Sequence, residues 1–188
     1  MLNIKKIALT AALSLLALSS AHALNVVNTI TLDGDVDTGY SAGLSDPSGT
    51  DVFHLVSGVF TDKFTFKFTG GSLVDVSLVT SAAQDELTMQ QIVFTSADVN
   101  GIAITIKDGK ILGDTVLRSA SLFQASANND LVLTINGYAG LNGSAGRDIA
   151  ASYSGTVNVT AVPEPETYAL MLGGLAAIGF VARRRKSV

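Results

Sequence analysis

The sequence predicts an all-β domain, an antiparallel β-sandwich or jelly-roll, between two apolar terminal segments. The first indication is the stretch FTDKFTFKFT at residues 60–69, where Phe64, Phe66 and Phe68 share one face and Lys and Thr the other. Such strict alternation is typical of a half-buried strand. The second indication is a series of Gly, Asn, Asp and Ser clusters, which are typical of turns, between short apolar runs. Together they favour a sandwich in residues 24–161.

We expect each apolar run to form one strand, and eight or nine strands at this spacing favour an antiparallel sandwich or jelly-roll. In chain order the runs are 24–31, 51–60, 60–69, 73–80, 91–95, 102–107, 115–123, 131–136 and 151–161. The expected turns are Gly70-Gly71, Asn100-Gly101, Asp108-Gly109, Asn128-Asn129-Asp130 and Asn136-Gly137. Residues 137–146 (GYAGLNGSAG) are predicted to form one long surface loop.

The N-terminal segment predicts export. Lys5 and Lys6 precede an apolar run at residues 7–18, and Ala21 and Ala23 supply the small side chains of a signal peptidase site. The run is too short for a comfortable transmembrane helix. Residues 1–23 are therefore expected to be a signal peptide, with the Sec translocon and signal peptidase as partners and a mature chain that begins at Leu24.

The C-terminal segment, residues 162–188, has three parts. Pro163-Glu164-Pro165 disfavours helix and holds an extended backbone. Residues 168–182 form an uncharged run that, as a helix, spans about 22 Å against a hydrocarbon core of roughly 30 Å, which predicts a single short transmembrane helix. A basic cluster follows, which consists of Arg183, Arg184, Arg185 and Lys186. By the positive-inside rule it is expected to stop transfer through the membrane and to keep the C-terminus in the cytoplasm. The alternative is a buried C-terminal helix of the main domain.

In order and spacing these three parts resemble the PEP-CTERM sorting signal of Gram-negative bacteria, over residues 162–186. The resemblance implies recognition by an exosortase, cleavage near Pro163-Glu164-Pro165, and a chain that is a substrate rather than an enzyme. It also implies transient inner-membrane anchoring, followed by release to the cell surface or to an extracellular polysaccharide and biofilm matrix.

A second resemblance lies at Phe60, Asp62 and Phe64, which are similar to the Phe-x-Asp-x-Phe signature of the FxDxF subgroup of these proteins. In a continuous strand Asp62 would share a face with both phenylalanines, and a buried unpaired carboxylate is costly. We therefore expect a turn or bulge at residues 61–63, where Asp62 caps backbone N–H groups in a structural role. Ligand binding by Asp62 is the alternative.

Composition excludes some functions. Residues 24–162 hold six cations and 14 acids, so this region carries −8 whereas the whole chain carries −4. This sign argues against nucleic-acid binding and is compatible with divalent cations at a cell surface. The chain has no cysteine, which excludes disulfides, thiol nucleophiles and Cys-ligated metals.

The acidic run Asp33, Asp35 and Asp37, with Asp46 as a further ligand, is the candidate calcium site. It fails the EF-hand pattern, because Thr38 stands where Gly is needed and Leu44 where a bidentate Glu belongs. A solvated acidic loop is the simpler reading.

His54 is the one histidine of the mature region, and no G-x-S-x-G elbow accompanies it. The chain lacks Trp, so few aromatic platforms remain for sugars; they are Tyr40, Tyr138 and Tyr153. We therefore predict no catalytic residue, metal or cofactor, and a non-enzymatic surface or matrix protein. A calcium- or glycan-binding module is the alternative, followed by a hydrolase centred on His54.

Overall fold

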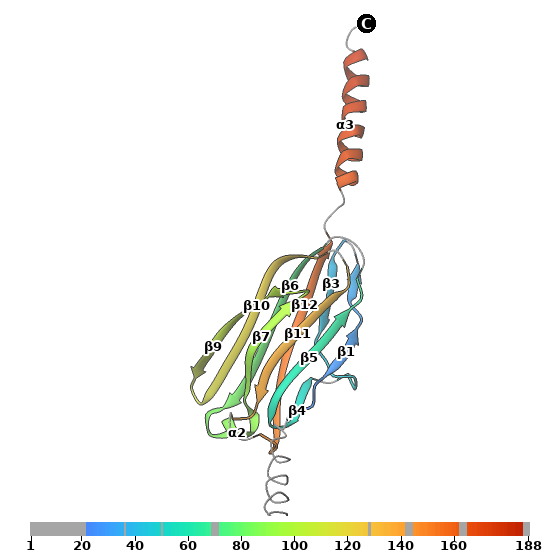
Figure 1. Cartoon of the computed structure of the whole chain (residues 1–188). Coiled ribbons are helices and arrows are strands. Elements are labelled where there is room, and N and C mark those ends of the chain that lie inside the picture. Colours follow the sequence, from blue (N-terminus) through green and yellow to red (C-terminus); the bar gives the residue numbers. More distant parts are fainter. Residues whose placement is uncertain are drawn as a thin grey trace, which may run out of the picture.

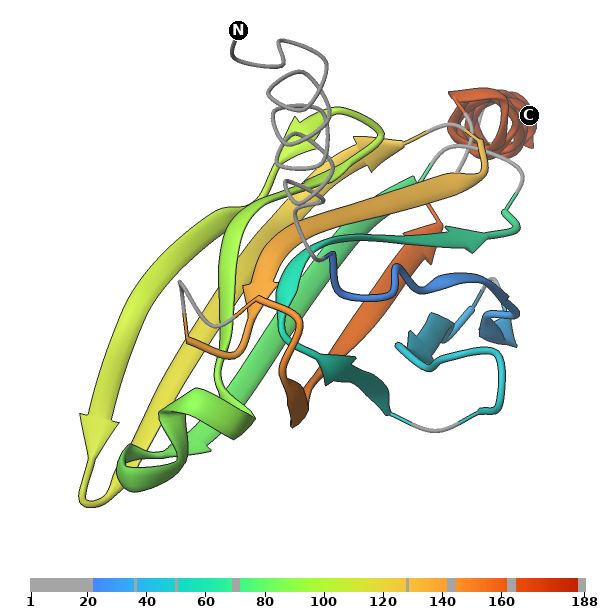
Figure 2. The same cartoon turned by 60° about the horizontal axis from the view of Figure 1, so that its bottom comes forward.

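Two β-sheets packed face to face form the domain, and a single helix follows it. The computed structural model describes residues 22–35, 37–49, 51–68, 72–127, 129–141, 145–161 and 165–185. Figures 1 and 2 show the two sheets as stacked layers, with the C-terminal helix leaving the end of the sandwich where the last strand stops. One continuous core of buried apolar side chains from both sheets lies between the layers. The predicted sandwich is thereby confirmed.

The first sheet has five strands in the order β1-β5-β11-β7-β8. Their bounds are β1 Val27–Ile30, β5 Gly58–Phe66, β11 Leu131–Ala139, β7 Ile92–Val99 and β8 Ile102–Ala103. All pairs are antiparallel except β1 with β5, which run parallel with Val27 opposite Lys63. The expectation of an entirely antiparallel sheet is therefore corrected at this edge.

The second sheet has seven strands: the order is β2-β3-β12-β6-β10-β9, and β4 also pairs with β12. Their bounds are β2 Asp33–Asp35, β3 Gly39–Gly43, β4 Val52–Val56, β6 Ser72–Ala83, β9 Thr105–Leu112, β10 Thr115–Ala127 and β12 Asp148–Ala161. A 3₁₀ turn at Gln84–Glu86 and the short helix α2, Leu87–Gln90, connect β6 to β7. Sheets of five and seven strands do not match the eight strands of a jelly-roll. Of the two predicted architectures, the structure therefore has the sandwich and not the jelly-roll.

The predicted strand 60–69 is present as far as Phe66, within β5, which begins earlier, at Gly58. Along β5 every second residue from Gly58 to Phe66 is buried, including Phe60, Phe64 and Phe66. The predicted turn at Asn100-Gly101 is also present, with φ of 50° and 83° at these two residues. Asn and Gly suit a turn that needs positive φ at both positions.

Three local predictions are corrected. Asp108-Gly109 lies inside β9, where the register with β10 shifts, and the turn comes at Gly113-Asp114 instead. Asn136-Gly137 lies inside β11, which runs to Ala139, so residues 137–139 belong to a strand rather than to a surface loop. Residues 33–35 and 39–43 form a hairpin where an acidic loop was expected. The expected turns at Gly70-Gly71 and Asn128 lie outside the described residues.

The helix α3, Pro165–Arg185, occupies the predicted place after the proline-rich break. Its described side chains, at residues 169–183, are all exposed. Among the helices of the described chain, none is long and apolar enough to cross a membrane, which corrects the predicted transmembrane helix. The physical reason lies in the sequence of α3, where the uncharged stretch has only 15 residues and the flanks carry Glu166 and three arginines.

Candidate functional site

The centre of the sandwich holds a buried carboxylate, that of Asp62. The predicted turn or bulge at residues 61–63 is wrong, because β5 continues through Asp62 with unbroken pairing to β11. Asp62 therefore points inward with Phe60 and Phe64, and its exposed fraction is 0%. All three residues of the motif line the core.

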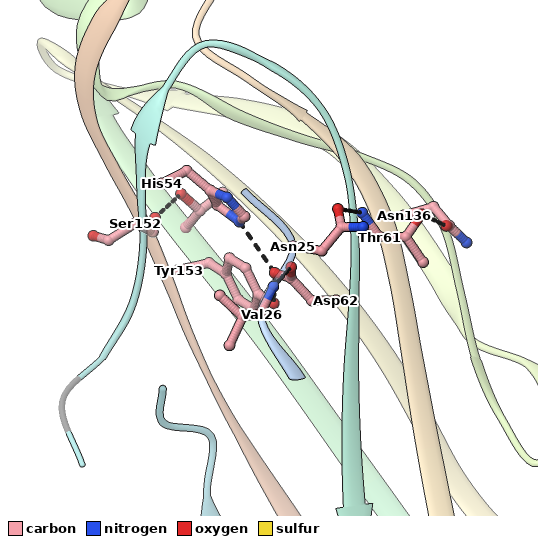
Figure 3. Close-up of polar contacts among 9 residues, drawn as sticks. Asn25, Val26, His54, Thr61, Asp62, Asn136, Ser152 and Tyr153 are labelled. Carbon is pink, nitrogen blue, oxygen red and sulfur yellow. Dashed lines mark hydrogen bonds and ion pairs between the residues drawn. The ribbon is translucent and has the colours of Figure 1, made fainter. Parts of the chain in front are cut away.

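Three donors surround this carboxylate and make its burial tolerable (Figure 3). The backbone N–H of Val26 donates to Oδ1 at 2.7 Å, and the hydroxyl of Tyr153 donates to Oδ2 at 2.6 Å. The Nε2 of His54 lies 3.0 Å from the same Oδ2, and since a carboxylate only accepts, the histidine is the donor. Asp62 was predicted to accept hydrogen bonds from nearby backbone N–H groups. It does accept one, but from Val26, which is far away in sequence. Hydrogen bonds to charged groups are the strong kind, so Asp62 joins β5 to both β4 and β12 of the other sheet.

The segment that precedes β1 is held against β5 by the same region. The side chain of Asn25 accepts a hydrogen bond of 2.8 Å from the Thr61 N–H, and the Lys63 N–H donates to the Val26 carbonyl at 2.8 Å. Ala23, one of the two predicted signal peptidase residues, donates its N–H to the Val59 carbonyl at 3.0 Å and is 3% exposed. The other, Ala21, lies outside the described residues, as does nearly all of the predicted signal peptide.

Aromatic rings surround the Asp62 cluster, which we define as Asp62, His54 and Tyr153. The His54 ring stacks on Phe60 with centroids 4.1 Å apart, and Phe94 meets Tyr153 edge to face at 5.5 Å. Burial, followed by the charge of Asp62 and the hydrogen bond to it, raises the pKa of the Tyr153 hydroxyl well above its usual value of 10.0. The phenol therefore stays protonated and remains a donor at physiological pH.

His54 does not have the surroundings of a catalytic base. It is 1% exposed, and within the described part of the chain its Nδ1 has no hydrogen-bond partner. A general base must reach a proton of the substrate, and this ring is enclosed by Phe60, Tyr153 and the carboxylate. The arrangement favours a structural role for the cluster and gives no support to a hydrolase centred on His54.

Gly137 completes the packing around the cluster. It pairs with Phe60 across the β5–β11 ladder, next to a register shift between β11 and β7. A Cβ at this position would lie 2.5 Å from the Phe60 ring and 2.7 Å from the Val93 carbonyl oxygen. The glycine is required because the Phe60 ring lies directly over its backbone.

Two of the four candidate calcium ligands, Asp35 and Asp46, accept hydrogen bonds within turns. Asp35 Oδ1 accepts hydrogen bonds from the N–H and the hydroxyl of Thr38 and from the N–H of Asp37, which lower the pKa of Asp35 in that order of importance. Asp46 similarly accepts from the N–H and hydroxyl of Ser48. These two carboxylates cap turns, and among the described residues no group of three or more His, Cys, Asp or Glu side chains is placed to hold a metal ion.

The sorting residues predicted at the C-terminus lie at both ends of α3. Pro165 is its first residue, a position that suits proline because no intrahelical N–H bond is needed there. Arg183, Arg184 and Arg185 form its last turn. Pro163, Glu164 and Lys186 lie outside the described residues.

Comparison with known proteins assigns this tail. The PEP-CTERM protein-sorting motif matches residues 161–186. The chain carries a PEP-CTERM sorting signal. This motif supports an exported protein that an exosortase processes. It covers only the tail, and the FxDxF subgroup is not confirmed by it.

The rest of the chain has only distant likenesses. No curated protein matches the sequence. Among solved structures, the periplasmic g-type lysozyme inhibitor PliG of Aeromonas hydrophila is 14% identical, with 73% of this chain and 100% of that one covered and a TM-score of 0.32. A PliG mutant of Escherichia coli is 12% identical, with 72% and 99% covered and a TM-score of 0.31. The pre-peptidase C-terminal domain of the Bacillus anthracis collagenase is 14% identical, with 73% and 95% covered and a TM-score of 0.24. TM-scores at this level carry no argument about function.

Sequence reasoning missed the role of Tyr153 and the true partners of Asp62. Tyr153 was considered only as a sugar platform, but it is 2% exposed and bonded to the carboxylate. Its position between Ser152 and Ser154 in an alternating strand was a usable signal for an inward side chain. The partner itself could not be read from the sequence, because it is 91 residues away.

Proposed function

We propose that this chain is an exported exosortase substrate of the FxDxF subgroup, whose β-sandwich is a non-enzymatic component of the cell surface or of the extracellular polysaccharide matrix. The observation that carries the proposal is the sorting motif at residues 161–186. In this account the exosortase cuts near Pro163-Glu164-Pro165 and releases the sandwich, and α3 with its arginines is the part that is discarded.

The separation of the tail from the domain supports this account. The last strand, β12, ends at Ala161, and α3 begins at Pro165, so the cleavage region lies between two complete elements. In Figure 1 α3 projects away from the sandwich. None of its described side chains, at residues 169–183, belongs to the core cluster, whose members lie between Ala23 and Val159. Removal of the tail therefore leaves the sandwich and its core intact.

The sandwich itself supports the non-enzymatic part. At its centre His54 and Tyr153 both bond to Asp62, and all three titratable residues are almost completely buried. A cluster of this kind holds two sheets together and has no access to a substrate. In this proposal the residues that resemble the FxDxF signature, Phe60, Asp62 and Phe64, serve to pack the two sheets together.

Cell fractionation of the producing bacterium tests the sorting. The wild-type chain is expected outside the cell, and a chain with Pro163, Glu164 and Pro165 replaced by Ala is expected to stay cell-associated with its tail. A matched control replaces Asp148, an exposed residue on β12, by Asn. Equal release of the wild-type and triple-variant chains would refute sorting through this motif.

A further inference from the structure

A groove opens on the outer face of the seven-stranded sheet, at the end of the sandwich opposite to the tail. It has a volume of about 250 Å³ and is lined by residues of β6, β10 and β12 together with Asp51. The register explains why it exists. The β6–β12 ladder ends at the pair Val79–Ser154, and from there β12 pairs with β4 instead, with Ser152 opposite Phe53. The separating strands leave the groove between them.

A side chain replaces the missing ladder bond at the floor of this groove. The Thr80 hydroxyl donates to the Ser152 carbonyl at 2.7 Å, and Thr80 is only 4% exposed. Tyr153 also lines the floor, and its hydroxyl is held by Asp62. Figure 3 shows Ser152 and Tyr153 side by side on β12, with Asp62 beyond the ring. The groove is therefore built on buried polar side chains that are fixed in place.

The walls of the groove present hydroxyl groups to solvent. Ser152 and Ser154 flank the inward Tyr153, and so they point outward, and Ser81 joins them from β6. Among the described residues none of these three hydroxyls has a protein hydrogen-bond partner. On the outer face of the other sheet the comparable polar groups bond to each other, since Thr61 donates to Asn136 and Asn136 donates to Ser96. The groove hydroxyls thus remain available both as donors and as acceptors.

The charge of the groove selects among ligand classes. Among its described lining residues there is one carboxylate, Asp51, and neither lysine, arginine nor histidine. This composition disfavours anionic ligands, and a single carboxylate is too few for a cation. The outward apolar side chains of the described lining are those of Val79 and Leu117, which are few for a lipid-like ligand. A neutral polyhydroxylated ligand satisfies all of these conditions.

We propose that this groove binds one sugar unit of a neutral polysaccharide. The hydroxyls of Ser81, Ser152 and Ser154 and the carboxylate of Asp51 bond to the sugar hydroxyls. Phe53, which is 45% exposed and pairs with Ser152, offers an aromatic surface to the neighbouring unit, because the C–H face of a sugar ring is apolar. This inference rests on the proposed function and names the ligand of the sandwich.

Native affinity electrophoresis of the full chain, kept in solution with a mild detergent, tests the groove. The gels contain dextran, hydroxyethyl cellulose or galactomannan as neutral probes and alginate as the acidic probe. We expect at least one neutral polysaccharide to retard the wild-type chain. The double variant Ser152→Ala with Ser154→Ala is expected to weaken the retardation by about tenfold, since it loses hydrogen bonds to the ligand. Asp51→Asn is expected to weaken it by a smaller factor.

Thr134→Ala is the matched control, because Thr134 lies on β11 opposite the exposed Lys63, on the outer face of the other sheet. It should leave the retardation unchanged, and unaltered thermal unfolding of each variant shows that it is folded. No retardation by any neutral probe, retardation by alginate alone, or equal retardation of the double variant and the wild type would overturn the proposal. Any of these outcomes leaves sorting through the tail untouched, because sorting is measured separately by cell fractionation.

Discussion

The hydroxyl of Tyr153 on β12 donates a hydrogen bond of 2.6 Å to the carboxylate of Asp62 on β5, across the space between the two sheets. His54 on β4 adds a second bond to the same oxygen, and Val26 a backbone bond to the other. Asp62 thus connects the two layers and the segment that precedes β1 at one point. An inward carboxylate in a row of phenylalanines, costly by itself, becomes a means of fixing how the sheets pack.

Replacement of Asp62 by Asn is expected to lower the free energy of unfolding by about 2–4 kcal/mol. The amide has one acceptor atom and one donor group where the carboxylate has two acceptors, so at least one of its three donors loses its partner in the core. Equilibrium unfolding in urea measures the change. Asp148→Asn, at an exposed position, serves as the control and should shift the midpoint little. Equal midpoints for the two variants would show that Asp62 does not hold the sheets together.

Tyr153→Phe is expected to remove the hydrogen bond but keep the ring, at a cost of about 1.5–3 kcal/mol near pH 7. The pKa of Tyr153 is raised in the folded state, so the native protein holds this proton when the unfolded chain has lost it. The stability due to the phenol is therefore complete below about pH 10 and decreases as the pH rises above that value.

The variant should lack this alkaline decrease. Urea unfolding at pH 8 and pH 10.5 measures it as the difference between two free energies, and Tyr40→Phe, at the other end of the sandwich, is the control. If Tyr153→Phe loses as much stability as the wild type between these pH values, the phenol of Tyr153 is not the group responsible.

Gly137→Ala is expected to destabilise the domain by about 1–3 kcal/mol, because the new methyl group meets the Phe60 ring and the Val93 carbonyl. Gly43→Ala is a suitable control in another strand, since the nearest atom to its Cβ lies 4.0 Å away. Thermal unfolding compares the two. Adding Phe60→Leu to Gly137→Ala should recover part of the loss, and strictly additive effects would contradict the packing relationship between these residues.

Calcium is expected to leave the melting temperature unchanged within about 1 °C, because a ligand stabilises the native state only if it binds there. Asp35 and Asp46 already accept hydrogen bonds in turns. Differential scanning calorimetry with millimolar Ca²⁺ and with a chelator checks this, with Mg²⁺ as the control. A saturable upward shift specific to Ca²⁺ would restore the acidic run as a binding site.

The strands could be predicted where alternation is strong. In β5 and β12 the inward positions follow the sequence pattern directly, because side chains of a strand point to opposite faces in turn. The short hairpin of β2 and β3 could not be predicted in this way. Asp33, Gly34 and Asp35 are poor strand formers, and only pairing with β3 makes them a strand.

The environment of Asp62 shows where sequence reasoning ends. The alternation placed it among phenylalanines, but its donors come from 8, 36 and 91 residues away, and topology alone brings them together. The same holds for Gly137. An Asn-Gly pair favours a turn by local chemistry, and the need for space under the Phe60 ring is visible only once β5 and β11 are paired.

The C-terminal tail is expected to direct sorting of the exported chain and then to be removed. Intact-mass analysis of the protein recovered from outside the producing bacterium tests this most directly, because one spectrum reports both ends of the chain. We predict a chain that begins near Leu24 and ends close to Pro163-Glu164-Pro165. It lacks the rest of the tail, and the bond that is cut decides whether Pro165 is kept. A mass that includes Arg183, Arg184, Arg185 and Lys186 would contradict the account.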